Sequence, residues 1–210
     1  MTDAGTDVVA EQVVQSAERR PWLVLNHLSR LVVDPERFPD DREVMRGVGM
    51  GAVYTKTSHG EVLRSDDPDH ERLLVRRVYE PYAAAVAEVV QGRLSACDSA
   101  VIIDVHSYPF EPLPYELYPL ARRPTVCLGV DDVHTPSWLR DSAHDVFALL
   151  GDVAENEPFT GAYVPLRHYG TDRRVASLMV EIRRDSDGRL PAGVAGAVTA
   201  LVDAVPTQGT

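Results

Sequence analysis

The chain has 210 residues, of which 44% are hydrophobic and 25% charged, so it is long enough to bury the core of one globular domain. Lysine and arginine together number 21 against 32 acidic residues, and the net charge of -11 opposes binding to nucleic-acid phosphate or anionic lipid. No stretch approaches the roughly 18 apolar residues of a membrane helix, and the N-terminus lacks signal-peptide order. We therefore expect a cytoplasmic protein that binds neither nucleic acid nor membrane.

The first third of the chain predicts one helix, two strands and a long loop. Apolar residues at helical spacing begin at Thr6, and Pro21 stops that helix. Short runs of β-forming residues at 22–25 and 31–33 predict two strands. Residues 39–69 show no sustained period and several glycines, so we expect a surface excursion there rather than a core element.

The middle of the chain predicts a long helix followed by a central strand. Apolar residues recur every three or four positions over 70–92, and Pro81 predicts a kink. The apolar run Ala100–Ile103 then ends in Asp104-Val105-His106-Ser107. This is the pattern of a buried strand that delivers polar residues at its carboxyl end, where α/β proteins keep their chemistry.

The remainder alternates between strands and helices. Residues 126–130 predict a strand, Thr135-Pro136 predicts an N-cap and first turn before a helix through Leu150, and 175–182 predicts another buried strand. Residues 192–205 predict a closing helix with a frayed tail after it. The pattern predicts an α/β fold, a three-layer α/β/α domain with a mixed, largely parallel sheet, as one domain over 1–210.

The two cysteines carry little functional signal. Cys97 and Cys127 stand thirty positions apart beside apolar runs, without a CxxC partner. A nucleophilic cysteine needs a positioned histidine and an electropositive setting, and neither has a local sign here. We expect reduced, buried cysteines.

Asp104 and His106 form the strongest local constellation. Residues two apart on a strand face the same way, and this pair falls where the apolar run stops. A carboxylate beside an imidazole can be a metal ligand with its orienting partner, or half of a general-base pair. A hydrogen-bonded pair that merely closes the strand is an equally good interpretation.

Glu181 is the second candidate, because it directly follows the apolar residues of a core strand. A carboxylate in a partly desolvated cleft can take a proton from the attacking water in metal-assisted hydrolysis. The alternative is an ion pair with Arg183 or Arg184, which would relieve the cost of burying the charge.

Arginines near the strand ends form the third group. Arg30 and Arg37 lie in a stretch of mixed charge, and Arg167 precedes His168. An acidic protein that binds an acidic small molecule needs such guanidinium groups, which hold carboxylates bidentately. These four residues are candidates for substrate binding, although exposed charge runs are more often solvated faces.

Several motifs together resemble the N-formylglutamate amidohydrolase family, in the family's order and over about Met1 to Arg184. They are Ser-Arg-Leu-Val-Val-Asp-Pro-Glu-Arg-Phe-Pro-Asp-Asp at 29–41, Gly-Met-Gly-Ala-Val-Tyr-Thr at 49–55, Asp-Val-His-Ser-Tyr-Pro at 104–109, Pro-Leu-Pro-Tyr-Glu at 112–116, His-Thr-Pro at 134–136 and Met-Val-Glu-Ile at 179–182. The long proline-bearing motif is the most specific of them.

The resemblance implies a zinc-dependent hydrolase, similar in architecture to the zinc carboxypeptidases, that cleaves the formyl amide of N-formyl-L-glutamate to formate and glutamate. The family's metal-binding histidine falls on His106, and its general base falls on Glu181. A Thr-Asp motif of the family matches residues 2–7, which suggests Asp3 as a second metal ligand. The expected partner is a small acidic N-acyl amino acid.

The chain departs from the family pattern at two places. The family usually begins with a strand ending in Pro-His-x-Ser/Gly, whose histidine is expected to ligate the metal, and this motif does not precede Thr2. An incomplete site would bind zinc loosely, so one alternative is a catalytically inactive domain that binds an acidic ligand. Another alternative is a hydrolase that acts on a different acyl or peptide substrate. After Glu181, the family's aromatic stretch is replaced by Ile182-Arg183-Arg184-Asp185-Ser186-Asp187-Gly188.

Overall fold

A computed structural model describes residues 2–207 of the chain. Four strands form one sheet in the order β1-β4-β2-β3, namely β1 (Ala100–Tyr108), β2 (Val126–Gly129), β3 (Val153–Glu155) and β4 (Val175–Arg183). The pairs β1/β4 and β2/β3 are parallel, and β2/β4 is antiparallel. The mixed, largely parallel α/β sheet predicted from the sequence is confirmed.

Along the chain, helices precede, follow and lie between the strands. The α-helices are α1 (Thr6–Ser16), α2 (Pro68–Leu74), α3 (Glu80–Cys97), α4 (Ser137–Phe147) and α5 (Val194–Asp203), with a 3-10 helix η1 (Val44–Val48) and a π-helical segment η2 (Val75–Tyr79). None of the helices within 2–207 is both long and apolar enough to cross a bilayer.

Two compact units divide the chain, and each is described by itself. The loop unit comprises mainly residues 26–89 and 112–119, whereas the sheet unit comprises 3–25, 90–111 and the chain from 120 onward. The expectation of a single domain over 1–210 stays a prediction.

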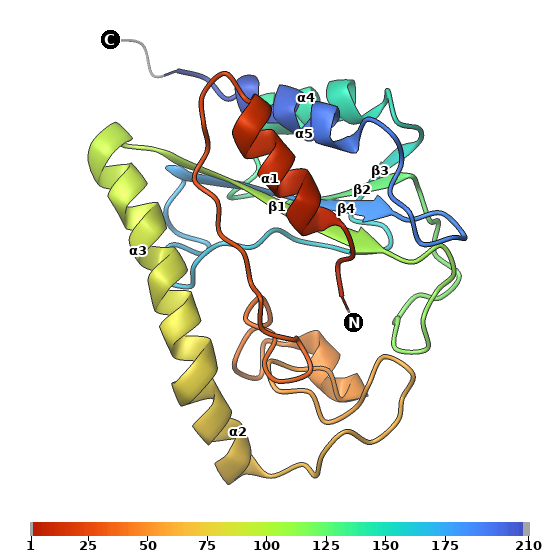
Figure 1. Ribbon diagram of the computed structural model, residues 1–210. Coiled ribbons are helices and arrows are strands. Elements are labelled where there is room, and N and C mark those ends of the chain that lie inside the picture. The colour runs from red at the N-terminus through yellow and green to blue at the C-terminus, as the bar shows by residue number, and fades with distance from the viewer. Residues whose placement is uncertain (1, 208–210) are drawn as a thin grey trace. The chain divides into compact units, whose positions relative to one another are not determined.

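One face of the sheet carries the main core of the sheet unit. Figure 1 shows α1, α4 and α5 on this face. Phe147 of α4 and Leu201 of α5 share a core with Leu178 and Ile182 of β4, and all four side chains are fully buried. Because side chains alternate along a strand, this apolar set leaves the odd-numbered residues of β4 for the opposite face.

The opposite face is apolar where the strands begin and polar where they end. Val90 and Leu94, in the second half of α3, pack with Ala100 and Val175, the first residues of β1 and β4. Further along, Asp104, His106 and Glu181 occupy this face. The sheet unit thus has helices on both faces, and its charged side chains gather toward the carboxyl ends of the two parallel strands.

The strands predicted at 22–25 and 31–33 are wrong. Residues 22–25 have no regular secondary structure and pair with no strand within the described chain, and the Trp22 ring lies against the guanidinium of Arg93. Residues 29–32 form a turn in which the Val32 N–H donates to the Ser29 carbonyl. Both runs had β-forming side chains but no partner edge, and a strand needs that edge for its backbone hydrogen bonds.

The expectation that residues 39–69 are only a surface excursion is wrong in part. Met45, Met50 and Tyr54 form a small buried cluster of the loop unit. Gly49 closes the turn after η1 with φ 82°, and a Cβ there would meet the Lys56 and Thr55 side chains at under 3.0 Å. Gly49 therefore permits tight packing in this turn, which the absence of a sequence period did not reveal.

Helix boundaries differ from prediction where side chains offer the backbone other partners. The first helix ends at Ser16, before Pro21, and the Glu18 N–H donates instead to the Asp203 carboxylate at 2.9 Å. Thr135 does not cap the following helix, which begins at Ser137, because its hydroxyl donates to the Ser177 carbonyl at 2.8 Å. Of the tail expected to fray, residues 208–210 lie outside the described part of the chain.

The helix predicted at 70–92 extends from Pro68 to Cys97 without a break in the helical chain. Pro81 lacks an N–H for the carbonyl four residues earlier, so the α-helical pattern cannot run through it. The interruption takes the form of the π-helical segment η2, in which the Glu80 N–H donates to the Val75 carbonyl.

Ion pairs that weaken at low pH link β3 to α4. Glu155 accepts hydrogen bonds from Arg140 and from His144 Nε2, the latter at 2.7 Å. The Arg140 guanidinium, followed by His144, lowers the pKa of Glu155. A carboxyl whose pKa is lower in the folded state stabilises the protein above its unfolded pKa, and this stabilisation is lost as the pH falls.

Glu155→Gln is therefore expected to destabilise the protein by about 0.5–1 kcal/mol near pH 7 and by less near pH 4, because the pair is partly exposed. Urea unfolding at both pH values measures this difference. Glu61→Gln, an exposed carboxyl in the loop unit, is the control and should change stability little at either pH. An equal loss at both pH values for Glu155→Gln would contradict the ion-pair explanation.

Candidate active site

The pairing of β1 with β4 places His106 beside Glu181. The two residues are direct partners in the parallel register, so their Cα atoms lie about 4.8 Å apart and their side chains share a face. That face is opposite the one covered by α1, α4 and α5 (Figure 1). Two candidates separated by 75 positions in the sequence are thus brought together by one strand pair.

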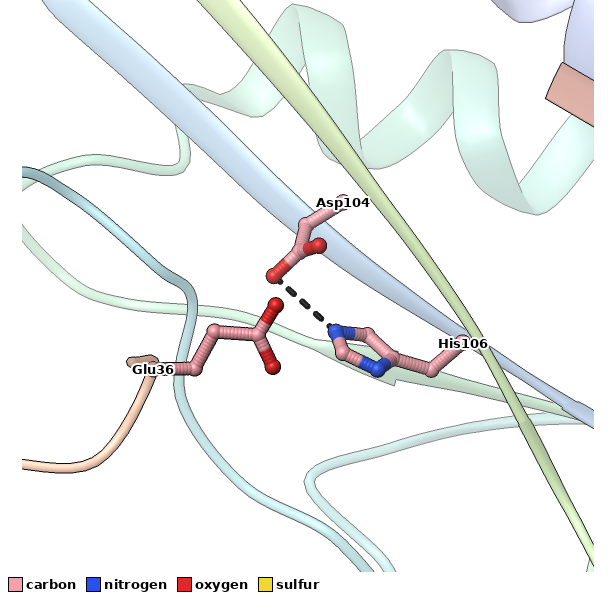
Figure 2. Close-up of side chains that lie close together, drawn as sticks. All are labelled: Glu36, Asp104 and His106. Carbon is pink, nitrogen blue, oxygen red and sulfur yellow. Dashed lines mark ion pairs between the residues drawn. The ribbon is translucent and has the colours of Figure 1, made fainter. Parts of the chain in front are cut away.

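His106 is buried, with 5% of its surface exposed, and carboxylates flank both ring nitrogens. Asp104 Oδ2 lies 3.1 Å from Nε2, and Asp3 Oδ1 lies 3.5 Å from Nδ1. Figure 2 shows the Asp104 carboxylate directed at the imidazole, with the ion pair dashed. The two carboxylates restrict the orientation of the ring.

Backbone contacts at the start of the chain hold Asp3 in this position. The Ser107 N–H donates to Asp3 Oδ1 at 3.2 Å, and the Ser107 hydroxyl donates to the Ala4 carbonyl at 3.1 Å. Thr6 donates from its N–H and hydroxyl to the Asp3 carbonyl as α1 begins. The start of α1 is therefore attached to the end of β1 next to His106.

Asp3 and His106 fit a zinc ion. They supply the carboxylate oxygen and imidazole nitrogen that zinc binds, and ligands of a tetrahedral zinc lie about 3.3 Å apart, close to the 3.5 Å between Oδ1 and Nδ1. Asp104 and His106 are likewise close enough to hold one ion. With Nδ1 facing the metal, Asp104 at Nε2 would be the usual carboxylate partner of a histidine ligand.

Cys127 lies on the other side of Glu181, as its partner on β2. Burial, with a smaller contribution from the Glu181 charge, raises the pKa of the Cys127 thiol to about 11. The thiol donates to the Phe159 carbonyl at 3.3 Å. Cys127 is a buried free thiol, as expected, whereas the expectation that Cys97 is buried is wrong, because its free thiol is only half-buried.

Arg183 and Arg184, the alternative partners considered for Glu181, both contact groups near the strand ends. Arg184 donates to the Ser107 hydroxyl at 2.7 Å, and Arg183 donates to the Arg123 carbonyl. The Arg183 guanidinium also lies over the Phe110 ring, 5.2 Å from its centroid. Both arginines therefore brace the ends of β1 and β4.

Arg30 and Arg37 are held by carboxylates of the loop unit. Asp34 is fully buried and lies 3.8 Å from Arg30 and 3.6 Å from Arg37, while the Tyr54 hydroxyl donates to it at 2.5 Å. Arg30 also binds Glu36 at 2.8 Å, the third side chain drawn in Figure 2. A buried carboxylate requires such partners, so the proline-bearing motif has a structural role in this unit.

Arg167 and His168 occupy one turn of the sheet unit. Arg167 Nε donates to His168 Nε2 at 3.1 Å, and His168 Nδ1 lies 3.4 Å from the Asp172 carboxylate. His134 fixes the same turn, because its Nε2 accepts from the Gly170 N–H and its Nδ1 bonds the Val175 carbonyl, both at 2.8 Å. His134 is thus a buried structural histidine.

Comparison with solved structures shows the same fold in two other proteins. An N-formylglutamate amidohydrolase from Ralstonia eutropha JMP134 matches with a TM-score of 0.71 and 21% identity over 97% of this chain and 80% of its own. The gene product Atu2144 from Agrobacterium tumefaciens matches with a TM-score of 0.65 and 20% identity over 93% of this chain and 72% of its own.

Sequence comparison gives a more specific result. No curated protein matches significantly. The family model for N-formylglutamate amidohydrolase, however, matches residues 1–186, which include Asp3, His106 and Glu181. Since the match spans most of the chain, this protein belongs to the N-formylglutamate amidohydrolase family.

Proposed function

We propose that this protein is a zinc-dependent amidohydrolase that cleaves N-formyl-L-glutamate, or a related N-acyl amino acid, to the free amino acid and the carboxylate of the acyl group, which is formate for a formyl group. The pairing of His106 with Glu181, with Asp3 and Asp104 on either side of the imidazole, is the observation that carries the proposal. Nitrogen and oxygen atoms of the kinds that zinc binds lie beside a carboxylate at the carboxyl ends of two parallel strands, which supports the proposal.

Each residue of the candidate site has a distinct chemical role in the proposed reaction. His106 and Asp3 would hold the zinc, and Asp104 would orient the imidazole. Zinc, when bound, polarises the acyl oxygen and lowers the pKa of water. Glu181 takes a proton from the attacking water and returns it to the leaving amine nitrogen, so formate and glutamate are released without a net change in the carboxylate.

Substrate carboxylates need cations, and Arg30, Arg37, Arg167 and His168 stay predictions for that role. Their guanidinium and imidazole groups are ordered by neighbouring side chains, which lowers the entropy cost of binding an anion. An arginine already bound to a carboxylate can still contribute its other N–H groups, because the guanidinium has five.

A second candidate function is that of an inactive domain that binds an acidic ligand. The carboxylates of Asp3 and Asp104 beside His106 favour this function as well. A protonated His106 would be satisfied by Asp3 and Asp104 without any metal, because both ring nitrogens then donate. The two functions differ in whether zinc binding and turnover accompany ligand binding.

Formate release by the purified full chain, with and without added zinc, tests the proposal. We expect release from N-formyl-L-glutamate that depends on zinc and exceeds release from N-formyl-L-methionine, because the side-chain carboxylate adds a charged contact. Zinc-independent binding of N-formyl-L-glutamate without formate release would favour the second candidate. Faster release from the methionine compound would contradict an acidic substrate.

A further inference from the structure

Arg183 lies on the face of the sheet that carries His106 and Glu181, and it follows Glu181 by two residues along β4. It is the last residue of β4, and because it follows Glu181 by two positions its side chain leaves the same face of the sheet. The spacing along a strand puts the two Cα atoms about 6.6 Å apart. Its partner on β1 is Tyr108, which follows His106 by two positions in the same way.

Among residues 2–207, the guanidinium of Arg183 has no carboxylate partner. Over residues 2–207, no carboxylate oxygen lies within 4.0 Å of it, unlike Arg30 and Arg37, which bind acids of the loop unit. It donates from Nη1 to the Arg123 carbonyl and rests on the Phe110 ring. These contacts fix its position and leave Nε and Nη2 for another acceptor.

We propose that Arg183 anchors a carboxylate of the substrate. This inference rests on the proposed function, because it takes the His106–Glu181 pair as the place of hydrolysis. In N-formyl-L-glutamate both carboxylates lie only a few bonds from the formyl carbon, a reach comparable to the spacing of Glu181 and Arg183. An ordered guanidinium without an internal carboxylate suits a bidentate contact with such a group.

Arg183 is the cationic residue of β4, and it lies on the face of the sheet that carries Glu181. Asp3, by contrast, shares the site as an acid and cannot contribute to anion binding. Arg183 would thus set the preference of this protein for a substrate of matching charge.

Calorimetric binding of three ligands tests the role of Arg183 without requiring turnover. The ligands are N-formyl-L-glutamate and its two monoamides, N-formyl-L-glutamine and N-formyl-L-isoglutamine, each of which lacks one carboxylate. We expect Arg183→Gln to weaken binding of N-formyl-L-glutamate roughly 10- to 100-fold, the loss typical of one charged hydrogen bond. For the monoamide that lacks the anchored carboxylate, wild type and variant should bind alike.

Two further variants, one conservative and one a control, complete the binding measurements. Arg183→Lys retains the charge without the bidentate geometry, so its loss should be smaller than that of Arg183→Gln. Arg189→Gln removes an exposed arginine that pairs with Asp187 and should leave all three affinities unchanged. An equal loss for all three ligands, or a loss for none, would overturn the assignment of Arg183.

Formate release measured on the same proteins separates this inference from the proposed function. If wild type binds N-formyl-L-glutamate through Arg183 but releases no formate, the hydrolase proposal fails and the anchoring role stands. If wild type releases formate and Arg183→Gln changes all substrates equally, only the anchoring role fails. If wild type binds none of the three ligands, both are overturned.

Discussion

Replacing His106 by Ala is expected to remove zinc binding and formate release together. The imidazole is the one neutral nitrogen ligand in the proposed site, and loss of a residue that merely orients a metal ligand already costs 10- to 100-fold in affinity or activity as a general rule. Loss of the ligand itself should therefore weaken zinc binding by more than roughly 100-fold and reduce turnover to background. Zinc titration followed by calorimetry measures the first effect, and formate release measures the second.

Because His106 is buried between two carboxylates, the Ala variant could be unstable for reasons unrelated to metal. His106→Asn keeps a polar side chain of similar reach and provides a second variant for the same measurements. His70→Ala, at an exposed histidine of α2, is the matched control and should leave both quantities unchanged. Normal zinc affinity in folded His106→Asn would remove His106 from the ligand set.

Glu181→Gln is expected to lower the turnover number by roughly 10²- to 10⁴-fold while zinc affinity and melting temperature stay near those of wild type. The amide has nearly the shape of the carboxylate but cannot take a proton from water. Zinc binding should persist, because Glu181 enters the site from β4 and the proposed ligands belong to β1 and the start of α1. Formate release at saturating substrate measures the change.

Glu11→Gln, at an exposed carboxylate of α1, is the control for removing one negative charge from the sheet unit. It should leave turnover unchanged. If Glu181→Gln retained near-normal turnover, Glu181 would have a structural role and the base would have to be sought at Asp104 or His168. If it unfolded the protein, the proposed mechanism would lose its central residue.

The elements nearest the site were those that the sequence predicted best. The buried runs beginning at Ala100 and Val175 carry continuous apolar residues, a strong signal because both faces of these strands are covered. The polar residues that interrupt the runs, His106 and Glu181, were visible for the same reason. Their direct pairing was not, since strand order and register are set by long-range contacts that a local pattern does not encode.

The loop unit was predicted less well because its structure depends on specific pairings between side chains. Asp34 is buried only because Arg30, Arg37 and Tyr54 surround it, and a charge pattern alone reads as a solvated surface. The apolar run at 31–33 accordingly packs inside a turn-rich unit instead of forming a strand. Local β propensity is overridden where no partner edge is present.

The candidate site, too, could be predicted from the sequence only in part. The proximity of Asp3 to His106 followed from the family resemblance, and the contacts of Ser107 account for it physically. Arg183 could be recognised as an anion anchor only after the partners of the other arginines were known. A sequence shows which residues are cationic, but not which of them are neutralised within the fold.

The most direct test of the central claim is the turnover number of Glu181→Gln relative to wild type, measured with N-formyl-L-glutamate at equal zinc occupancy. A base on β4 beside a zinc ligand on β1 predicts a ratio of about 10⁻² or below with unchanged zinc content. A ratio near one at equal occupancy would contradict the assignment of hydrolysis to the His106–Glu181 pair.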